Sequence, residues 1–309
     1  MNQTQGHLHL EFTRANQSSE SSKTILKLRR QEPPLRVVRA FHPTLEKDPL
    51  EKNSLENNPV EECPALVHLH NISGGVLGGD HLTLEVDVQA GAQAQVTTTS
   101  ATRVYRHRDN RPAATQVNRL SVASGGLLEY LPDALIPFAQ SRYRQQTAIT
   151  LADDAGLFYW EVVAPGRIAS GERFDYDLLE LSVDIQTPDR PIVIERTKLE
   201  PAQHPLASPV RLGGYAYFAT FYICRVGWPA AQWQQLEQHL CEFADSLTSS
   251  DAQAGESALW GVSQLPAHGL SIRALSQTIR PLLTHLPTFW STAKKTIYGQ
   301  RAIMPRKVY

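Results

Sequence analysis

The sequence predicts a mainly β protein of the α+β class, with a β-helix-like stack of strands and two C-terminal amphipathic helices. Three observations lead to this fold class. Segments of alternating apolar and polar residues fill the first two thirds of the chain, and glycine-containing turns separate them at a nearly regular spacing. The last third changes to helical periodicity. We expect all 309 residues to form a single domain.

The alternation of apolar and polar residues marks the individual strands. Residues 82–88 place Leu and Val at every second position, as do residues 179–185, which is typical of half-buried strands. Residues 158–163 carry large apolar side chains on both faces, so we expect both faces of that strand to be covered. Nearer the N-terminus, three further strands are expected: His7–Phe12, Thr24–Leu28 and Leu35–Phe41.

Turns follow these strands at similar intervals. Gly91, Gly125 and Gly156 are 34 and 31 residues apart, and the turn at Asp189-Arg190 comes about one interval later. Such spacing indicates strand–turn–strand units that stack on a continuous core. An antiparallel meander with regular turns would produce the same spacing, so both arrangements remain open.

The C-terminal third is helical in pattern. Gln232–Leu247 has apolar residues at intervals of three and four, and Pro229 stands just before it, where a helix start tolerates proline. Two further elements follow: a hairpin of Ser257–Leu265 and Gly269–Ala274, and a helical stretch, Leu275–Lys295. Pro281 and Pro287 require that this second helix kink or restart.

Composition and charge exclude several classes of protein. Thirty basic and 31 acidic residues give a net charge of −1, without the broad positive charge of a nucleic-acid-binding protein. Met1–Leu10 lacks the apolar run of a secretion signal, and the thirteen uncharged residues Leu212–Cys224 are fewer than the roughly 20 that span a bilayer. The odd number of cysteines suits a reducing compartment. We therefore expect a cytoplasmic protein without nucleic-acid or membrane partners.

The glycine-rich segment Gly74–Asp80 does not match a nucleotide-binding loop. It lacks the Lys-Ser/Thr that binds phosphate, and it leads into a strand rather than a helix. Its glycines instead allow positive φ angles and the close approach of another backbone segment. We expect Asp80 to accept hydrogen bonds from turn amides, with a contact to a partner or an ion as the alternative.

Histidine and arginine residues offer two weaker signals. His68 and His70 lie on one face of a strand and His81 follows the glycine-rich segment, but no acidic or thiol ligand completes a recognisable metal-binding spacing. We therefore expect no permanently bound metal. Arg103 and Arg106 belong to a basic segment that is either a solvated loop or a surface for an anionic partner.

Several carboxylates stand next to large apolar residues: Glu129, Asp133, Glu161 and Glu172. A buried carboxylate is costly unless it is paired, so these residues either form salt bridges or line a wet cavity. A carbohydrate-active hydrolase on a β-helix would use two such carboxylates, although no spacing here singles out an acid and a base.

Taken together, the motifs resemble the urease accessory protein UreD (UreH) family. The matching residues include a GG-apolar-GGD segment, a TT…TR-apolar-Y segment and LE-aromatic-LP, WE, GR and GE pairs: Gly74, Gly75, Gly78, Gly79, Asp80, Thr98, Arg103, Tyr105, Glu129, Pro132, Asp133, Trp160, Glu161, Gly166, Arg167, Gly171 and Glu172. The resemblance extends from Leu8 to Pro305-Arg306. Two departures are Ile72-Ser73, where the family often has Pro-Pro, and a polar insertion at residues 46–62, expected to be flexible.

The resemblance implies a non-enzymatic scaffold for urease maturation. Family members bind UreF and, through it, the GTPase UreG, and the complex promotes nickel insertion into apo-urease. Nickel(II) would then be in transit rather than a resident cofactor. The expected path uses Asp80, Glu129, Glu161 and Glu172; turn capping and salt bridges with Arg167 or Arg173 are the alternative roles of these residues. The β-helical carbohydrate-active hydrolase remains the alternative function.

Overall fold

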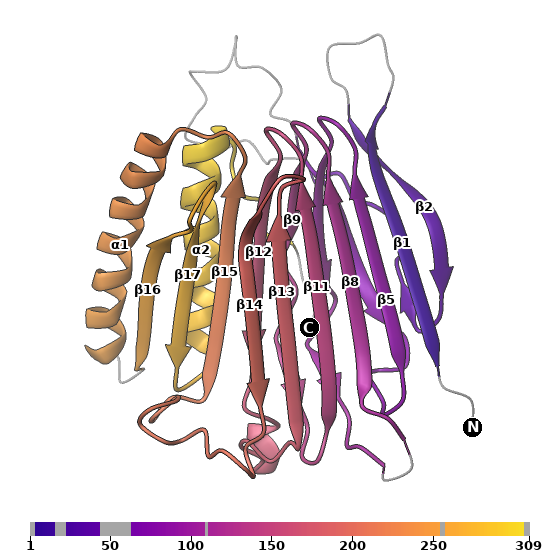
Figure 1. Ribbon diagram of the computed structural model, residues 1–309, viewed down its shortest axis with the longest axis vertical. Helices are drawn as coiled ribbons and strands as arrows, with labels where there is room; N and C mark the ends of the chain where they lie inside the picture. Colours follow the sequence, from indigo (N-terminus) through magenta and orange to yellow (C-terminus); the bar gives the residue numbers. More distant parts are fainter. Residues whose placement is uncertain (1–3, 16–22, 44–62, 109–110, 254–256, 306–309) are drawn as a thin grey trace.

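The computed structural model describes residues 4–15, 23–43, 63–108, 111–253 and 257–305, which form two β-sheets packed face to face (Figure 1). The first sheet of the described residues has seven strands: β14 (Pro191–Leu199), β13 (Leu178–Gln186), β11 (Arg142–Leu151), β8 (Ala114–Val122), β5 (His81–Val88), β1 (Gln5–Arg14) and β2 (Thr24–Glu32).

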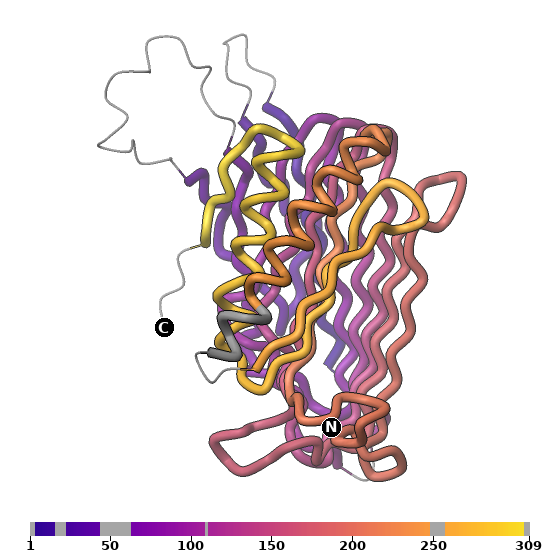
Figure 2. Tube along the Cα trace, turned by 90° about the vertical axis from the view of Figure 1, so that its left-hand side faces the viewer, coloured from indigo at the N-terminus to yellow at the C-terminus, as the bar shows by residue number. Residues whose placement is uncertain are grey.

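The second sheet is larger and carries the helices. Its described strands are, in spatial order, β16 (Ala258–Gln264), β17 (Gly269–Ser276), β15 (Tyr217–Arg225), β12 (Gly156–Val163), β9 (Leu127–Tyr130), β6 (Gln93–Thr98), β4 (Ala65–Asn71) and β3 (Leu35–Arg36). In addition, β10 (Leu135–Pro137) pairs with β12, and β7 (Thr102–Val104) pairs with β10. Helices α1 (Ala230–Gln253) and α2 (Arg280–Tyr298) lie on the side of this ten-stranded sheet that faces away from the seven-stranded sheet (Figure 2).

The strands stack as repeated units, as the regular turn spacing suggested. The chain passes from β5 to β6, from β8 to β9 and from β11 to β12, crossing each time from the seven-stranded to the ten-stranded sheet. Each strand runs parallel to its counterpart in the next unit. The turns are joined as well: the Gly91 amide donates to the Ser124 carbonyl at 3.0 Å, and the Gly125 amide donates to the Asp153 carbonyl at 3.2 Å. The central part is therefore a two-layered parallel stack and not an antiparallel meander.

The parallel stack ends at β13. The turn at Asp189-Arg190 does not continue the stack, because it joins β13 to β14 as an antiparallel hairpin. Strands β15, β17 and β16 likewise add to the ten-stranded sheet in antiparallel pairs. The fourth turn therefore keeps the regular spacing but joins antiparallel strands, a difference that the spacing does not reveal.

Most predicted elements are present; strands β1 and β2 and helix α1 extend beyond their expected ends, and two other elements change more. The strand expected at Leu35–Phe41 is reduced to the two residues of β3 and an isolated bridge from Phe41 to Leu66. The second helix begins at Arg280 rather than Leu275, because the preceding residues pair with β15 and β16 as strand β17. Pro281 then lies in the first turn of α2, and Pro287 lies inside the helix. The insertion at residues 46–62 lies outside the described residues.

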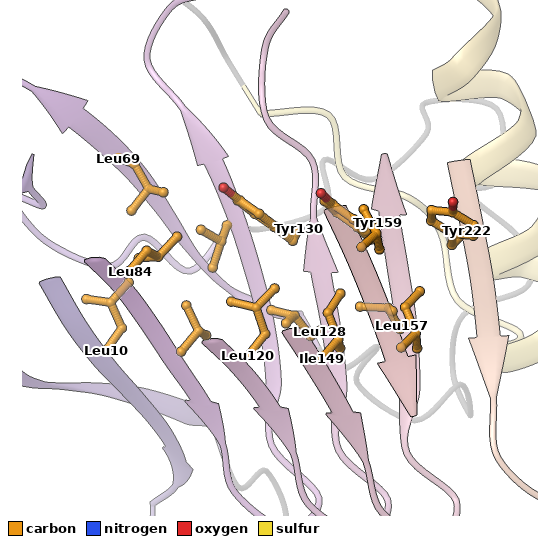
Figure 3. Close-up of a cluster of buried hydrophobic side chains, with 14 of the residues drawn as sticks. Leu10, Leu69, Leu84, Leu120, Leu128, Tyr130, Ile149, Leu157, Tyr159 and Tyr222 are labelled. Carbon is orange, nitrogen blue, oxygen red and sulfur yellow. The ribbon is translucent and has the colours of Figure 1, made fainter. Parts of the chain in front are cut away.

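Two apolar cores hold the layers together. One fills the space between the sheets, and Figure 3 shows part of it, with Leu120 and Ile149 of the seven-stranded sheet opposite Leu128 and Leu157. The other lies between the ten-stranded sheet and the helices. Strand β12 contributes to both cores, which confirms that both of its faces are covered. No helix in the described part of the chain is both long and apolar enough to cross a lipid bilayer.

The left-handed backbone of a stacked turn can be tested by substituting its glycine. Gly125 has φ +65°, and a Cβ added there meets no atom within 4 Å; an added Cβ at Gly261 of β16 also meets none, but Gly261 is not in the left-handed region. We expect Gly125→Ala to lower the free energy of unfolding by about 1–2 kcal/mol through left-handed backbone strain alone. Gly261→Ala should be neutral or stabilising by up to about 1 kcal/mol. Urea denaturation of both variants checks this, and equal effects would contradict it.

Candidate functional site

A cavity of about 140 Å³ lies between the two sheets. Its walls come from stacked strands of both layers, including β8, β11 and β13 on one side and β6, β9 and β12 on the other. Exposed residues at one end, Gly74, Ser100 and Arg103, also line it. The cavity therefore reaches from the interior of the sandwich to the surface at this end, which we call the first mouth.

Two of the sequence motifs meet at the first mouth. The Val76 amide donates to the Arg103 carbonyl at 2.7 Å, and the Tyr105 amide donates to the Val76 carbonyl at 2.8 Å. A Cβ at Gly75 would lie 2.7 Å from that same Arg103 oxygen, so only glycine permits this approach. Gly74 has φ +78°. The prediction that the glycines serve close backbone approach and positive φ is confirmed.

A row of tyrosines forms one wall between the layers. The strand register places Tyr130, Tyr159 and Tyr222 side by side on β9, β12 and β15. Their rings stack with centroid distances of 5.5 Å and 6.2 Å, and their hydroxyl groups project from the sheet at the same level (Figure 3). Tyr130 and Tyr159 line the cavity. The row gives this wall a line of hydroxyl groups above the apolar core.

Polar side chains of the seven-stranded sheet meet this wall. The Tyr143 hydroxyl lies 3.0 Å from Gln116 Oε1 and 3.1 Å from Gln145 Oε1. One layer along, the Asn118 amide donates to Thr147 Oγ1 at 3.0 Å. Sequence reasoning missed this network. The alternation along β8 and β11 could have revealed it. Every second residue of these strands faces inward, and the inward positions just before the buried Leu and Ile residues are polar: Gln116, Asn118, Gln145 and Thr147.

Glu161 is the carboxylate that the fold directs into the cavity. It shares the inward face of β12 with Tyr159, and the Gln145 amide donates to its Oε1 at 2.5 Å. Burial raises the pKa of the Glu161 carboxyl to about 7, and the charge of nearby Glu195 contributes to the increase. The hydrogen bonds from Tyr159 and Gln145 act in the opposite direction. The carboxyl can therefore exchange its proton near neutral pH, with neutral donors around it rather than a fixed cation.

Asp133 lines the cavity near the first mouth. The Thr98 hydroxyl lies 3.1 Å from its Oδ2, and the Asp133 amide donates back to Thr98 Oγ1 at 2.8 Å. The Trp160 indole donates to the Pro132 carbonyl at 2.8 Å, which fixes the segment that carries Asp133. These motif residues thus shape the wall of the cavity.

Asp80 and Glu172 lie outside the cavity lining. Asp80 is buried and accepts a hydrogen bond from the Leu77 amide at 2.9 Å, which confirms its expected turn-capping role. Glu172 pairs with Arg167 and accepts from the Ala139 amide at 3.1 Å. These contacts hold the pKa of the Glu172 carboxyl below its ordinary value. Both residues stabilise loops.

Other motif residues support the same loop. Gly166 has φ +143° and packs against the Glu172 backbone, while Gly171 caps the short 3-10 helix Ile168–Ser170 with φ +78°. The Arg167 guanidinium lies 4.2 Å from the centre of the Phe138 ring. Gly78 and Gly79 approach the side chains of the basic segment, where His107 and Arg111 are the nearest neighbours of an added Cβ. Arg106, like Arg103, is exposed.

Glu129 lies on the opposite face of the ten-stranded sheet from Glu161. Lys294 of α2 approaches its carboxylate at 2.9 Å and 3.1 Å, and the Trp290 indole donates to Oε1 at 2.8 Å. Glu129 and Lys294 are both fully buried. Their charges compensate each other, so Glu129 anchors helix α2 to the sheet and does not face the cavity.

The three histidines considered as ligands occupy separate surroundings. His70 lines the cavity near the first mouth, the His68 ring packs edge-on against Phe41, and His81 Nδ1 lies 2.7 Å from the Thr115 hydroxyl. Across the ranges that the structure describes, no three His, Cys, Asp or Glu side chains gather in a way that could hold a metal ion.

Comparisons with known proteins relate the whole chain to a single family. The family of UreD urease accessory proteins matches residues 4–309. A urease accessory protein UreD from Herpetosiphon aurantiacus is 46% identical over 98% of this chain and 96% of its own length. Relatives of the same name from Dechloromonas aromatica and Alkalilimnicola ehrlichii are 31% and 32% identical, each over 97% of this chain and 92% and 90% of their own lengths.

The pKa of Glu161 leads to a pH-dependent stability difference. Its folded value of about 7 exceeds the ordinary 4.5, so the folded chain binds this proton more tightly than the unfolded chain does. The free energy of unfolding should therefore fall as pH rises from about 4.5 to about 7, by on the order of 2 kcal/mol from this group. We expect Glu161→Gln to lack this decrease, which urea denaturation at several pH values measures. Glu172→Gln, at a carboxyl with a lowered pKa, is the control, because its difference from wild type should change by less than about 0.5 kcal/mol over that range.

The anchor of α2 makes a second test. Lys294→Met leaves Glu129 buried without its counter-charge and should destabilise the protein by about 3–5 kcal/mol. The double variant Glu129→Gln/Lys294→Met, which keeps an acceptor for Trp290, should cost less than Lys294→Met alone. At the exposed pair of Arg144 with Glu180, Arg144→Met should cost less than about 1 kcal/mol. The free energy of unfolding is measured for each variant and for Glu129→Gln alone. If the effects of Glu129→Gln and Lys294→Met simply add up in the double variant, the two residues are not coupled.

Proposed function

Because this chain belongs to the UreD family of urease accessory proteins, we propose that it is a non-enzymatic scaffold that promotes nickel insertion into apo-urease. It acts in the cytoplasm as a complex with UreF and the GTPase UreG. Nickel(II) is its cargo rather than a resident cofactor. The observation that most supports a role in handling the metal is the cavity between the sheets, which contains Glu161 and opens at the first mouth.

The chemistry of the cavity suits a cation in transit. The imidazole of His70 lines it near the first mouth, and carboxylate, hydroxyl and amide oxygens line it elsewhere, from Glu161, Asp133, Tyr159 and Gln145. Oxygen ligands bind nickel(II) less tightly than imidazole or thiolate ligands, so an ion that enters can also leave. Glu161 exchanges its proton near neutral pH and can thus offer a carboxylate for a passing cation without holding a permanent charge partner.

The four carboxylates of the expected path differ in their binding partners, and only Glu161 lies in the cavity without a cationic partner. Glu129 is neutralised by Lys294, and Glu172 by Arg167. Asp80 caps a turn. We therefore propose that Glu161 is the principal carboxylate of the path, with Asp133 near the first mouth. The other three act by holding the surrounding elements in place.

The surface around the first mouth suits a partner with acidic groups. Arg103 and Arg106 are exposed there, at a segment whose backbone is fixed by the glycine motif. Arginine is favoured at protein interfaces because its guanidinium forms bidentate bonds with carboxylates. We propose that this edge contacts another protein of the maturation complex. A carbohydrate-active hydrolase is not favoured, since the chain matches accessory proteins over its whole length.

Substitution of Glu161 tests the path. With the other accessory proteins and apo-urease present, Glu161→Gln should lower the nickel content and activity of urease roughly tenfold, the scale expected when a group that tunes a metal site is lost. Glu180→Gln, on the outer face of the seven-stranded sheet, is the matched control and should load urease normally. Metal analysis of purified urease and co-purification of the chain with a UreF homologue are measured together. Normal loading by Glu161→Gln within an intact complex would refute the path.

A further inference from the structure

A groove lies beyond the edge of the seven-stranded sheet. The ten-stranded sheet extends past edge strand β14, and the step between them forms a hollow of about 440 Å³. Strand β14 forms one side from Ile192 to Thr197, and residues of β15 and β17 form the other, among them Tyr222, Ser271 and Arg273. No motif or periodicity of the sequence marks this groove.

Two stacked rings separate the groove from the internal cavity. Tyr159 lines the cavity and Tyr222 lines the groove. They are neighbours in the strand register, and their rings stack at 6.2 Å between centroids with an interplanar angle of 22° (Figure 3). The interior polar wall thus continues to the open side of the sandwich, where Tyr222 is its last member in the row.

Glu195 holds the Tyr222 ring at the groove. The Tyr222 hydroxyl donates to the Glu195 carboxylate, and Arg273 Nη2 lies 2.6 Å from the same carboxylate. The Glu195 side chain is 19% exposed and that of Arg273 is 61% exposed, so their ion pair reaches the surface, whereas Tyr222 itself is buried. The charge of Glu195 also contributes to the raised pKa of the Glu161 carboxyl on the cavity side of the two rings.

We propose that the groove is a second mouth of the cavity, closed by Tyr222 and opened when its hydroxyl leaves Glu195. Rotation of the Tyr222 side chain removes the outer of the two rings, and movement of Tyr159 joins the cavity to the groove. Glu195 then becomes an acceptor for a small hydrated divalent cation that passes Glu161. The identity of the cargo rests on the proposed function, whereas the existence of the opening does not.

The opening can be measured without metal or partner proteins. We introduce Leu181→Cys, which lines the cavity, together with Ser100→Trp, which obstructs the first mouth, in the full-length chain. The probe is 2-aminoethyl methanethiosulfonate, a small cationic thiol reagent. Peptide mass spectrometry follows labelling at position 181 over time. Native Cys241, which is partly exposed on α1, reports the reactivity of the outer surface.

Tyr222→Phe keeps the ring but loses the hydroxyl that binds Glu195. It should raise the labelling rate at position 181 about tenfold, the factor expected when a hydrogen bond to a charged group no longer favours the closed state. Glu195→Ala should have a similar effect, and Tyr222→Ala a larger one. Tyr176→Phe, which removes another buried hydroxyl, is the matched control and should leave the rate unchanged. Labelling of Cys241 should be the same in all variants.

Unchanged labelling at position 181 in both Tyr222→Phe and Glu195→Ala would overturn the second mouth. An equal increase in Tyr176→Phe would also overturn it, because general loosening of the fold would then explain the access. Nickel loading of urease by Tyr222→Phe is a separate measurement. If Tyr222→Phe speeds labelling at position 181 but Glu161→Gln still loads urease normally, the opening exists and the proposed nickel path is refuted.

Discussion

Hydrogen bonds between successive parallel strands and turns are the constraint on which the other features depend. They fix which residue of one unit lies beside which residue of the next, as between Gly91 and Ser124 and between Gly125 and Asp153. Because side chains in a strand alternate between two faces, a shift by one residue would exchange the interior and exterior of the stack. The tyrosine row, the polar network of β8 and β11, and the inward direction of Glu161 all follow from this register.

Burial of polar groups in such a stack has two different outcomes here. Glu129 and Glu161 lie on neighbouring strands but on opposite faces of the ten-stranded sheet. Glu129 meets a buried lysine, and the pair fixes one position of α2 on the sheet, since any other position would leave a charge without a partner. Glu161 is hydrogen-bonded by amide and hydroxyl groups, and burial raises its pKa to about 7 because these neutral donors compensate its charge incompletely. The first arrangement restrains the fold, whereas the second leaves a group that can react to a proton or a cation.

Most of the motif residues act by shaping the surroundings of the cavity. The glycine segment permits the backbone contact with Arg103 and Tyr105, Thr98 holds Asp133, and Trp160 holds Pro132. None of these contacts requires a reaction on this chain. A fold with a polar cavity between its sheets is consistent with the accessory role of the family to which the chain belongs.

The sequence by itself determined the fold class, the strand–turn repeat, the amphipathic helices and the motifs of the family, since these depend on local periodicity and on turn chemistry. It also favoured turn capping by Asp80 over a contact with a partner or an ion, and the structure confirms the turn-capping bond. Only the tertiary structure decided which carboxylate faces the cavity, because the partners of Glu129 and Glu161 are remote in sequence or on another layer: Lys294 lies 165 residues from Glu129. The end of the parallel stack at β13 was likewise a tertiary result, since a hairpin turn and a stacking turn share the same local chemistry. Ion pairs and cavities arise from register and packing between distant strands, and no local pattern encodes them.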